Sequence, residues 1–121
     1  GQTLAIQNLN FIPGRHFLLP ESEPILKDLV QILNDNPTLT IEIQGHICCM
    51  AQNLDGLDKD TKTMNLSVNR AKYIYNYLID HDISPYQLTF KGFGASKPLV
   101  SEITEADRVK NRRVEIMIIE K

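Results

Sequence analysis

The chain has 121 residues, 42% of them apolar, which suits one compact domain whose core needs neither metal ions nor several disulfides. Its formal net charge of −2 argues against a nucleic-acid-binding protein, because such a protein would usually carry a dominant basic surface. No apolar run has the length of a membrane-spanning helix, and no leader typical of a signal peptide opens the chain. We therefore expect residues 1–121 to form one domain, cut from a longer protein whose other parts would make any contact with a membrane.

The first third of the chain favours a strand followed by a helix. Residues 4–11 are expected to form the strand, and a loop with Gly14 and two prolines follows. The helix is expected to begin after Ser22, because a serine hydroxyl can cap the free backbone N–H groups there, with Pro24 in the first turn. The apolar side chains predicted to share its core face are Ile25, Leu29, Ile32 and Leu33.

The remaining elements complete a pattern of alternating strands and helices. Residues 39–45 alternate apolar and polar side chains, which is typical of a half-buried strand. After a long polar loop, a second helix is expected with Ser67 as its cap. A third strand at 88–90, a short helical turn at 105–110 and a last strand at 114–119 follow. This order predicts an α+β fold: a two-layer sandwich with the helices packed on one face of a mixed sheet.

Arg70 is placed unfavourably for the helix that contains it. It follows Ser67 by three residues, in the expected first turn, where a cation faces the positive end of the helix dipole. The guanidinium is therefore either solvated or part of a receptor for an anion. A guanidinium beside free backbone N–H groups would bind a carboxylate, because both offer donors and positive charge to the same point.

Arg112 is the second cation with a notable position. Strand alternation puts it on the same face as Val114, Ile116 and Ile118, whereas Arg113 shares the opposite face with Glu115. If the first face looks toward the helices, the Arg112 charge lies at the edge of the core and needs a partner. That partner is either a ligand or an internal acid, such as Asp107 or a loop carboxylate.

Four short motifs together resemble the OmpA-like domain, the family of the OmpA C-terminal domain, Pal and MotB. They are Gly45-His46 after a strand, Leu66-Ser67-x-x-Arg70-Ala71, Gly92-Phe93-Gly94 with Pro98, and Asn111-Arg-Arg-Val-Glu115. Each motif is short, but their order and their positions on matching elements extend the resemblance from about Phe11 to Ile118.

The resemblance implies a non-catalytic, periplasmic module of a Gram-negative envelope. It would bind the diaminopimelate of peptidoglycan stem peptides and so tether the outer membrane to the cell wall, with no cofactor and no metal. In the family, the arginine that corresponds to Arg70 and an aspartate after Gly-His-Thr hold the ligand's carboxylate and amine. The first arginine of Asn-Arg-Arg, here Arg112, also lines the pocket, as does the loop near Gly14.

Two departures from the family pattern affect the ligand. Where the family has Gly-His-Thr-Asp, this chain has Ile47 and Cys48 in the last two positions, so the acid for the ligand's ammonium is missing. The family's asparagine three residues before Leu66 is Thr63 here. The loop between the two motifs is longer than usual and contains three aspartates, Asp55, Asp58 and Asp60, one of which could replace the lost carboxylate. The residues assigned to the peptidoglycan site are Gly14, Ile47, Cys48, Asp55, Asp58, Thr63, Leu66, Arg70 and Arg112.

Other readings of these residues stay open. His46 with the adjacent Cys48 and Cys49 could bind a metal, but the usual zinc spacing is absent. The three loop aspartates could bind calcium, but their spacing is not that of an EF-hand. An enzyme is not supported by any pairing of a nucleophile with a histidine. The main alternative is a domain of this fold that has lost or altered peptidoglycan binding and binds another protein.

Overall fold

The computed structural model describes residues 2–3, 9–12, 15–47, 55–56, 58–94, 104, 106 and 112–120. The elements in these ranges are β1 (Gln2–Thr3), β2 (Leu9–Asn10), η1 (Pro20–Ser22), α1 (Glu23–Asp35), β3 (Thr40–Gly45), α2 (Leu66–Asp80), η2 (Pro85–Gln87), β4 (Leu88–Gly92) and β5 (Arg113–Glu120). Of the predicted first strand, β2 and the isolated bridge between Phe11 and Leu18 lie inside the described residues. The predicted turn at 105–110 lies outside them, apart from Ala106.

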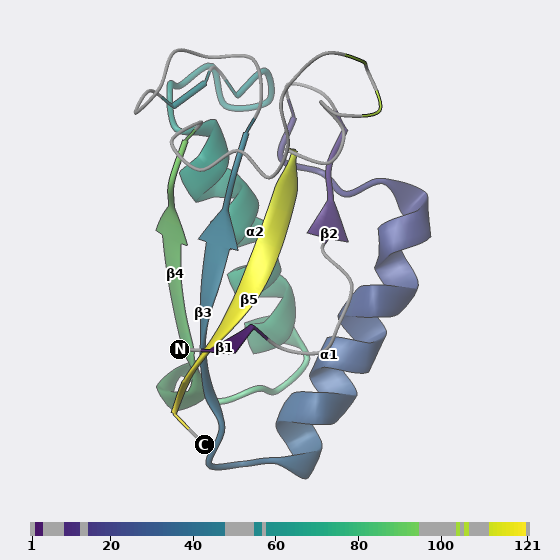
Figure 1. The fold of residues 1–121 in the computed structure, drawn as a ribbon, viewed down its shortest axis with the longest axis vertical. Helices are drawn as coiled ribbons and strands as arrows, with labels where there is room; N and C mark the ends of the chain where they lie inside the picture. The colour runs from purple at the N-terminus through teal and green to yellow at the C-terminus, as the bar shows by residue number, and fades with distance from the viewer. Residues whose placement is uncertain are drawn as a thin grey trace.

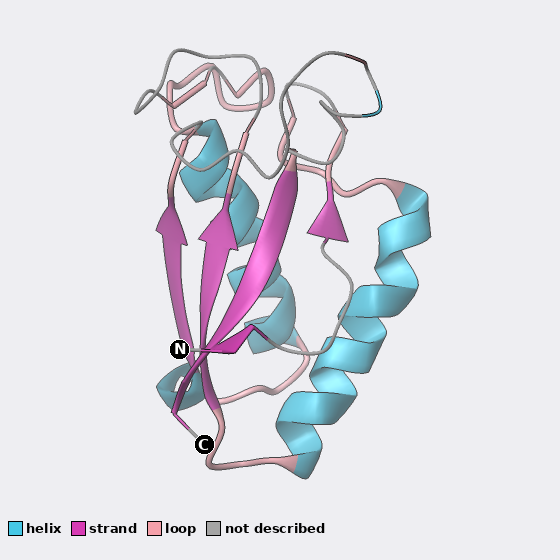
Figure 2. Cartoon of the chain, viewed as in Figure 1, coloured by secondary structure: helices cyan, strands magenta, loops and turns pink. Residues whose placement is uncertain are grey.

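The strands form one mixed sheet, in the order β1-β5-β3-β4, with β2 also paired to β5. β3 and β4 are parallel, and β5 runs antiparallel to β1, β2 and β3. In Figures 1 and 2, α2 passes behind the sheet as the crossover from β3 to β4, and α1 lies alongside, next to β2. The predicted two-layer α+β sandwich is thereby confirmed. Across the described helices, none has the length and apolar character needed to cross a bilayer.

Both helices and the sheet contribute to one core. Ile41 and Ile43 of β3 are fully buried, as the alternation predicts, and Val114 and Ile116 of β5 face the same core. Among the described residues, the buried apolar side chains that pack together in this core are Leu9, Phe11, Leu18, Leu26, Leu29, Leu33, Leu39, Ile41, Ile43, Ala71, Ile74, Leu78, Ile83, Leu88, Val114 and Ile116. On the opposite face, the guanidinium of Arg113 donates to Glu115, which is consistent with the prediction that these two side chains share a face of the strand.

Helix α1 begins where the sequence predicts, but the predicted capping hydrogen bond of Ser22 is not formed. Ser22 is its N-cap residue, yet its hydroxyl makes no capping hydrogen bond and instead accepts from the backbone N–H of Asn10 over 3.1 Å. The predicted core face is also rotated, because Leu26 is buried whereas Ile25 and Ile32 are only partly buried. The helix therefore presents Leu26, Leu29 and Leu33 to the core.

Two glycines let the first turn of α2 rest on the ends of β3 and β4. A Cβ on Gly45 would lie 1.9 Å from the backbone carbonyl oxygen of Ser67. A Cβ on Gly92 would lie 2.5 Å from both the Ser67 hydroxyl and the Val68 side chain. Any larger residue would push the helix away from the strands, so these glycines set the place of the residues that follow in α2, among them Arg70.

Candidate ligand-binding site

The N-terminus of α2 is stabilised by a residue that is distant in sequence. The prediction that Ser67 is the cap is wrong, because the helix begins at Leu66 and its N-cap residue is Asn65, which makes no side-chain capping bond. Asp55 takes this role instead. Its Oδ1 accepts the backbone N–H of Ser67 over 2.8 Å, and its Oδ2 accepts the Ser67 hydroxyl over 2.7 Å. A carboxylate here favours the helix, because it faces the positive end of the dipole.

Ser67 joins this carboxylate to the loop after β4. Its hydroxyl donates to Asp55 and accepts the backbone N–H of Gly94 over 2.9 Å, and the side chain is fully buried. Asp55 also accepts the backbone N–H of Gly56 over 2.8 Å, so both of its oxygens have intramolecular donors. Asp55, the loop aspartate farthest in sequence from α2, thus lies at the helix start, fixed by intramolecular hydrogen bonds.

Among the residues that the structure describes, Arg70 is the largest fully buried side chain, with 0% of its surface exposed. Because α2 begins at Leu66, Arg70 is its fifth residue and lies just after the first turn in which it was predicted. Its guanidinium donates to three backbone carbonyl oxygens: those of Arg15 (2.9 Å), Ile12 (3.1 Å) and His46 (3.2 Å). It also lies 5.2 Å from the centre of the Phe11 ring, within range of a cation–π interaction.

A guanidinium has five N–H donors, and Arg70 uses one on each of its three nitrogens. Among the described residues, no acceptor meets the remaining N–H on either terminal nitrogen. Burial, and to a smaller extent the positive charge of Arg112, lower the pKa of Arg70 to about 10, although Asp58 and Asp55 act in the opposite direction. At neutral pH the group therefore stays charged, with donors to spare.

Arg112 adds a second positive charge to the same region. It is 8% exposed and lies close enough to Arg70 for the two charges to repel each other. Two neighbouring buried guanidiniums are costly unless negative charge compensates them. Within the described part of the chain, Asp58 and Asp55 are the carboxylates that act favourably on Arg70. The arrangement suits the binding of an anion with a planar carboxylate.

Asp58 fixes the segment around His16, and this segment contains two carbonyl groups, those of Ile12 and Arg15, that accept hydrogen bonds from Arg70. Its side chain is fully buried, and its Oδ2 accepts from His16 Nδ1 over 2.7 Å and from Asn69 Nδ2 over 2.9 Å. Its Oδ1 accepts the backbone N–H of Asp60 over 2.9 Å. Burial acts to raise the pKa of Asp58, but these hydrogen bonds and the neighbouring His16 outweigh it and hold the pKa below its ordinary value.

Asp60 reinforces the same connection from a more exposed position. Its Oδ1 accepts from the Arg15 side chain over 2.9 Å, and its Oδ2 accepts the backbone N–H of His16 over 3.3 Å. Arg15 and His16 are thus held by loop aspartates, while the Arg15 carbonyl accepts from Arg70. The long loop therefore fixes the backbone around the guanidinium.

The other residues assigned to the site are placed as follows. Ile47 is buried and donates its backbone N–H to the Gly94 carbonyl over 3.0 Å. Leu66 is buried and donates its N–H to the Gly56 carbonyl over 3.1 Å, while Thr63 is exposed and pairs with Asp58 through the backbone. Gly14 and Cys48 lie outside the described residues. The structure thus brings Arg70, Arg112, Asp55 and Asp58 together, with Ile47 and Leu66 as buried neighbours.

The structure bears differently on the two possible metal sites, one at the loop aspartates and one at His46, Cys48 and Cys49. The three loop aspartates do not form one cluster, since Asp55 bonds to the start of α2, whereas Asp58 and Asp60 group with His16. One ligand atom from each of those three lies within 4.8 Å of the others, but hydrogen bonds to Arg15, His16 and Asn69 already occupy the two carboxylates. Cys48 and Cys49 lie outside the described residues, and His46 is stacked on Phe93 with ring centres 5.3 Å apart.

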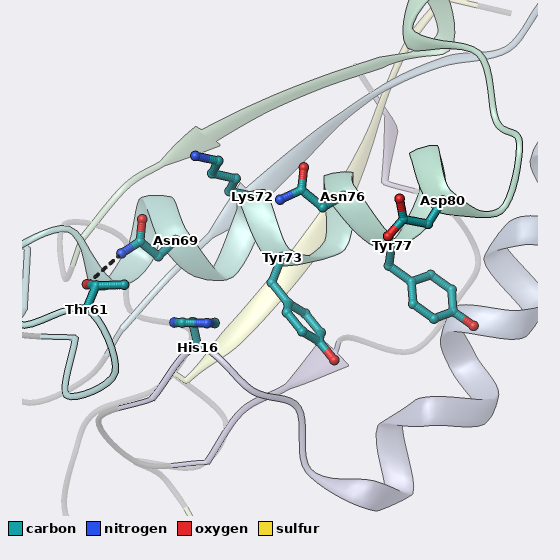
Figure 3. A pocket seen from close by; sticks show the side chains of 8 residues that line it. All are labelled: His16, Thr61, Asn69, Lys72, Tyr73, Asn76, Tyr77 and Asp80. Atoms are coloured by element: carbon teal, nitrogen blue, oxygen red, sulfur yellow. Dashed lines mark hydrogen bonds between the residues drawn. The ribbon is translucent and has the colours of Figure 1, made fainter.

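Sequence reasoning missed a groove of about 430 Å³ along the outer side of α2 (Figure 3). Its lining residues are His16, Thr61, Asn69, Lys72, Tyr73, Asn76, Tyr77 and Asp80. Six of them, from Asn69 to Asp80, lie in α2 at spacings of three, four and seven residues, so helix periodicity places them on neighbouring parts of the helix surface. That spacing was visible in the sequence, but His16, which is distant along the chain, was not predictable.

The sequence of this chain is similar to one protein family and to several known proteins. The sequence pattern of the OmpA family matches residues 10–112. The chain is 30% identical to outer membrane porin F of Pseudomonas fluorescens over 82% of its own length and 28% of that protein. It is 29% identical to the peptidoglycan-binding protein ArfA of Mycobacterium tuberculosis (strain H37Rv) over 84% of its own length and 29% of that protein.

The fold has a close counterpart among solved structures. The peptidoglycan-associated lipoprotein from Burkholderia pseudomallei superimposes with a TM-score of 0.75 at 22% identity, covering 95% of this chain and 92% of that one. By contrast, this chain spans less than half the length of the curated relatives it matches.

Proposed function

Because this chain belongs to the OmpA family, we propose that it is a non-catalytic module that binds peptidoglycan and anchors an envelope protein to the cell wall. The observation that carries the proposal is the pair of buried guanidiniums of Arg70 and Arg112, with unused donors on Arg70. The names of a curated relative, a peptidoglycan-binding protein, and of a structural neighbour, a peptidoglycan-associated lipoprotein, support the ligand class.

The ligand proposed for this site is the diaminopimelate of an uncrosslinked stem peptide. Its free carboxylate would accept from the remaining N–H groups of Arg70 and be attracted by Arg112, since guanidiniums bind planar carboxylates in a defined orientation. Water would be largely excluded from such a contact, because Arg70 is fully buried. The result would be a strong, oriented hydrogen-bond pair in a region of low dielectric constant.

The ligand's ammonium needs negative charge, and the family's aspartate is Cys48 here. Asp58 and Asp55 are the candidates to replace it, because both carboxylates lie near enough to Arg70 to raise its pKa. Their oxygens already accept intramolecular hydrogen bonds, so we propose that they attract the ammonium mainly through charge. Asp58→Asn and Asp55→Asn should then each weaken diaminopimelate binding, whereas Asp28→Asn, an exposed acid on α1, should not.

The setting proposed for the domain is the periplasm, next to the outer membrane. Residues 1–121 would be one domain of a longer protein whose other parts reach the membrane, with peptidoglycan rather than nucleic acid as the partner. The support is the share of its relatives' length that the chain covers, 28% in the case of an outer membrane porin. Diaminopimelate as the ligand and a Gram-negative source belong to the same proposal.

A second candidate is a domain of this fold that binds a protein instead. It is favoured by the lost acid at Cys48 and by the three backbone carbonyls that already hold Arg70. In that case the guanidinium would have a structural role, and no cell-wall ligand would be required.

Calorimetric titration with free meso-diaminopimelate separates the two candidates. Arg70→Lys and Arg112→Lys keep the positive charge but lose the planar fork, so each should weaken binding by about tenfold or more. Lys27→Gln, an exposed cation on α1, serves as the matched control. Because Arg70→Lys could disturb folding, Arg112→Lys and a circular dichroism spectrum accompany it.

Purified sacculi provide the second test. The domain should sediment with them and be released by free diaminopimelate. If the folded wild-type domain binds neither diaminopimelate nor sacculi, the anchoring proposal is wrong, and capture of a specific envelope protein would then support the second candidate.

A further inference from the structure

The groove along α2 has no role in the function proposed so far. It lies beside the Arg70 region rather than in it, between the outer side of α2 and the segment around His16 (Figure 3). Figure 3 shows Asn69, Tyr73 and Tyr77 along the helix, with His16 opposite Tyr73. The rings of His16 and Tyr73 have centres 6.2 Å apart. A groove of about 430 Å³ has room for a ligand of one or two sugar rings.

Several polar groups in this groove are available for a ligand, although His16, Thr61 and Asn69 already form hydrogen bonds within the protein. Among the described residues, none forms a hydrogen bond or ion pair with the side chains of Lys72, Asn76 or Asp80, or with the phenol groups of Tyr73 and Tyr77. The Asn69 amide nitrogen donates to Asp58 and to Thr61, so its orientation is fixed and its oxygen remains as an acceptor. The groove therefore offers donors and acceptors in positions that the fold has set in advance.

Two tyrosines give the groove aromatic surface that is already held in place. Tyr73 makes edge contacts with Phe11 and Phe17, with ring centres 6.4 and 5.8 Å away. Tyr77 is stacked on His81 with ring centres 4.0 Å apart. Packed rings lose little freedom when a ligand binds, and a tyrosine combines an apolar ring with a hydroxyl that can form hydrogen bonds.

The charge of the groove narrows the class of ligand. Lys72 and Asp80 are opposite in sign, so the lining has little net charge, and a polyanion or a strongly basic peptide would gain nothing from it. Amides, hydroxyls and aromatic rings without net charge suit a neutral ligand rich in hydroxyl and acetamido groups. The C–H faces of a sugar ring pack on aromatic rings, while its hydroxyls and acetamido group bond to asparagine amides.

Position along the helix connects the groove to the carboxylate site. Arg70 and Tyr77 are seven residues apart in α2, which corresponds to about 10 Å along the axis. In peptidoglycan, the linkage from the glycan to the diamino acid of the stem peptide runs through a lactyl group and two amino acids. Such a linkage can span about 10 Å when extended. One ligand molecule can thus reach both places.

On these grounds we propose that the groove of His16, Asn69, Tyr73, Asn76 and Tyr77 is a saccharide subsite for an N-acetylated amino sugar of the glycan strand. The inference rests on the proposed function, because it takes the stem peptide at Arg70 as the ligand's other end. It assigns to the outer side of α2 the recognition of the carbohydrate, and to the Arg70 region the recognition of the peptide.

The test uses two small probes that cannot substitute for each other. N,N′-Diacetylchitobiose is a neutral disaccharide of acetamido sugars without a carboxylate, and free meso-diaminopimelate contains no sugar. Each is titrated separately into the ¹⁵N-labelled chain, and backbone amide shifts are followed. Chitobiose should shift amides of residues 69–80 and 16 in a saturable way, and diaminopimelate should act around Arg70.

Asn76→Ala is the main variant, because Asn76 is exposed and makes no hydrogen bond to a described residue. It should weaken chitobiose binding about fivefold, the effect of one lost hydrogen bond, and leave the affinity for diaminopimelate unchanged. Tyr77→Leu keeps apolar bulk and should weaken binding at least as much. Asn34→Ala, at an exposed asparagine of α1, is the matched control and should bind chitobiose like the wild type.

The outcomes of the two probes are distinguishable. If chitobiose shifts no amides of α2, or if Asn76→Ala binds it like Asn34→Ala, the saccharide subsite is refuted even when diaminopimelate binds normally. If chitobiose binds in the groove and diaminopimelate does not bind at all, the subsite is upheld and the carboxylate site of the proposed function fails.

Discussion

Asp58→Asn should destabilise the protein strongly, although it replaces one oxygen by an NH₂ group of similar size. The carboxylate accepts three hydrogen bonds in a fully buried position, from His16, Asn69 and the backbone of Asp60. The amide has one oxygen in place of two, and its NH₂ group would face a donor. Hydrogen bonds to a buried charge contribute about 1.5–3 kcal/mol each, so we expect a loss of about 2–4 kcal/mol in the free energy of unfolding.

The same substitution should change how stability depends on pH. The pKa of Asp58 is lowered in the folded state, so its carboxylate contributes stability that is complete above the unfolded-state pKa of about 4. That contribution is lost as the pH falls through the lower folded-state pKa. The difference between wild type and Asp58→Asn should therefore be largest near neutral pH and shrink in acid below about pH 4.

Urea denaturation at pH 7 and pH 3 measures both effects, with Asp28→Asn as the exposed control. The reasoning is refuted if Asp58→Asn unfolds within about 0.5 kcal/mol of that control at pH 7, the range expected for surface substitutions. It is also refuted if the two variants lose stability in parallel as the pH falls.

Two further predictions concern the start of α2. Gly45→Ala places a methyl group against the Ser67 carbonyl, which is backbone and cannot turn aside, so we expect a loss of about 3 kcal/mol or more, or no folding. Thermal denaturation against Lys91→Ala, an exposed position on β4, measures it, and an unchanged melting temperature would contradict the packing described here. Ser67→Ala leaves the N–H of Gly94 and one oxygen of Asp55 without their partner, at a cost of about 1–3 kcal/mol. Asn34→Ala, at an exposed asparagine of α1, is its control in the same assay, and equal stability of the two variants would count against the buried role of Ser67.

Local patterns in the sequence were sufficient to predict the buried faces of the strands and the unusual position of Arg70. The alternation in β3 predicted its buried face, and the same rule put Val114 and Ile116 on one face of β5, which is buried, and Arg113 with Glu115 on the other. The position of Arg70 near a helix start identified it as unusual, and it is the largest fully buried side chain. These signals succeed because each depends on residues only a few positions apart.

Contacts between distant segments were not predictable in this way. A serine before a helix is usually its cap, but here Asp55 caps α2 from 12 residues away, and the Ser22 hydroxyl bonds to Asn10 instead. The His16–Asp58 pair joins residues 42 positions apart. No local pattern marks such partners, and local side-chain bonds at helix starts compete with these tertiary ones.

The acceptors that hold Arg70 are carbonyl groups of the main chain, and every amino acid has one. Exchanging the side chains of Ile12, Arg15 or His46 would leave those oxygens in place as long as the backbone keeps its path. An alanine scan would accordingly overlook three contacts of the buried guanidinium, whereas a one-residue deletion in the segment before α1 would displace two of the acceptors, the carbonyl groups of Ile12 and Arg15. Substitutions at these positions are thus compatible with an unchanged set of acceptors for Arg70, so in distant homologues these contacts should be judged by loop length rather than by residue identity.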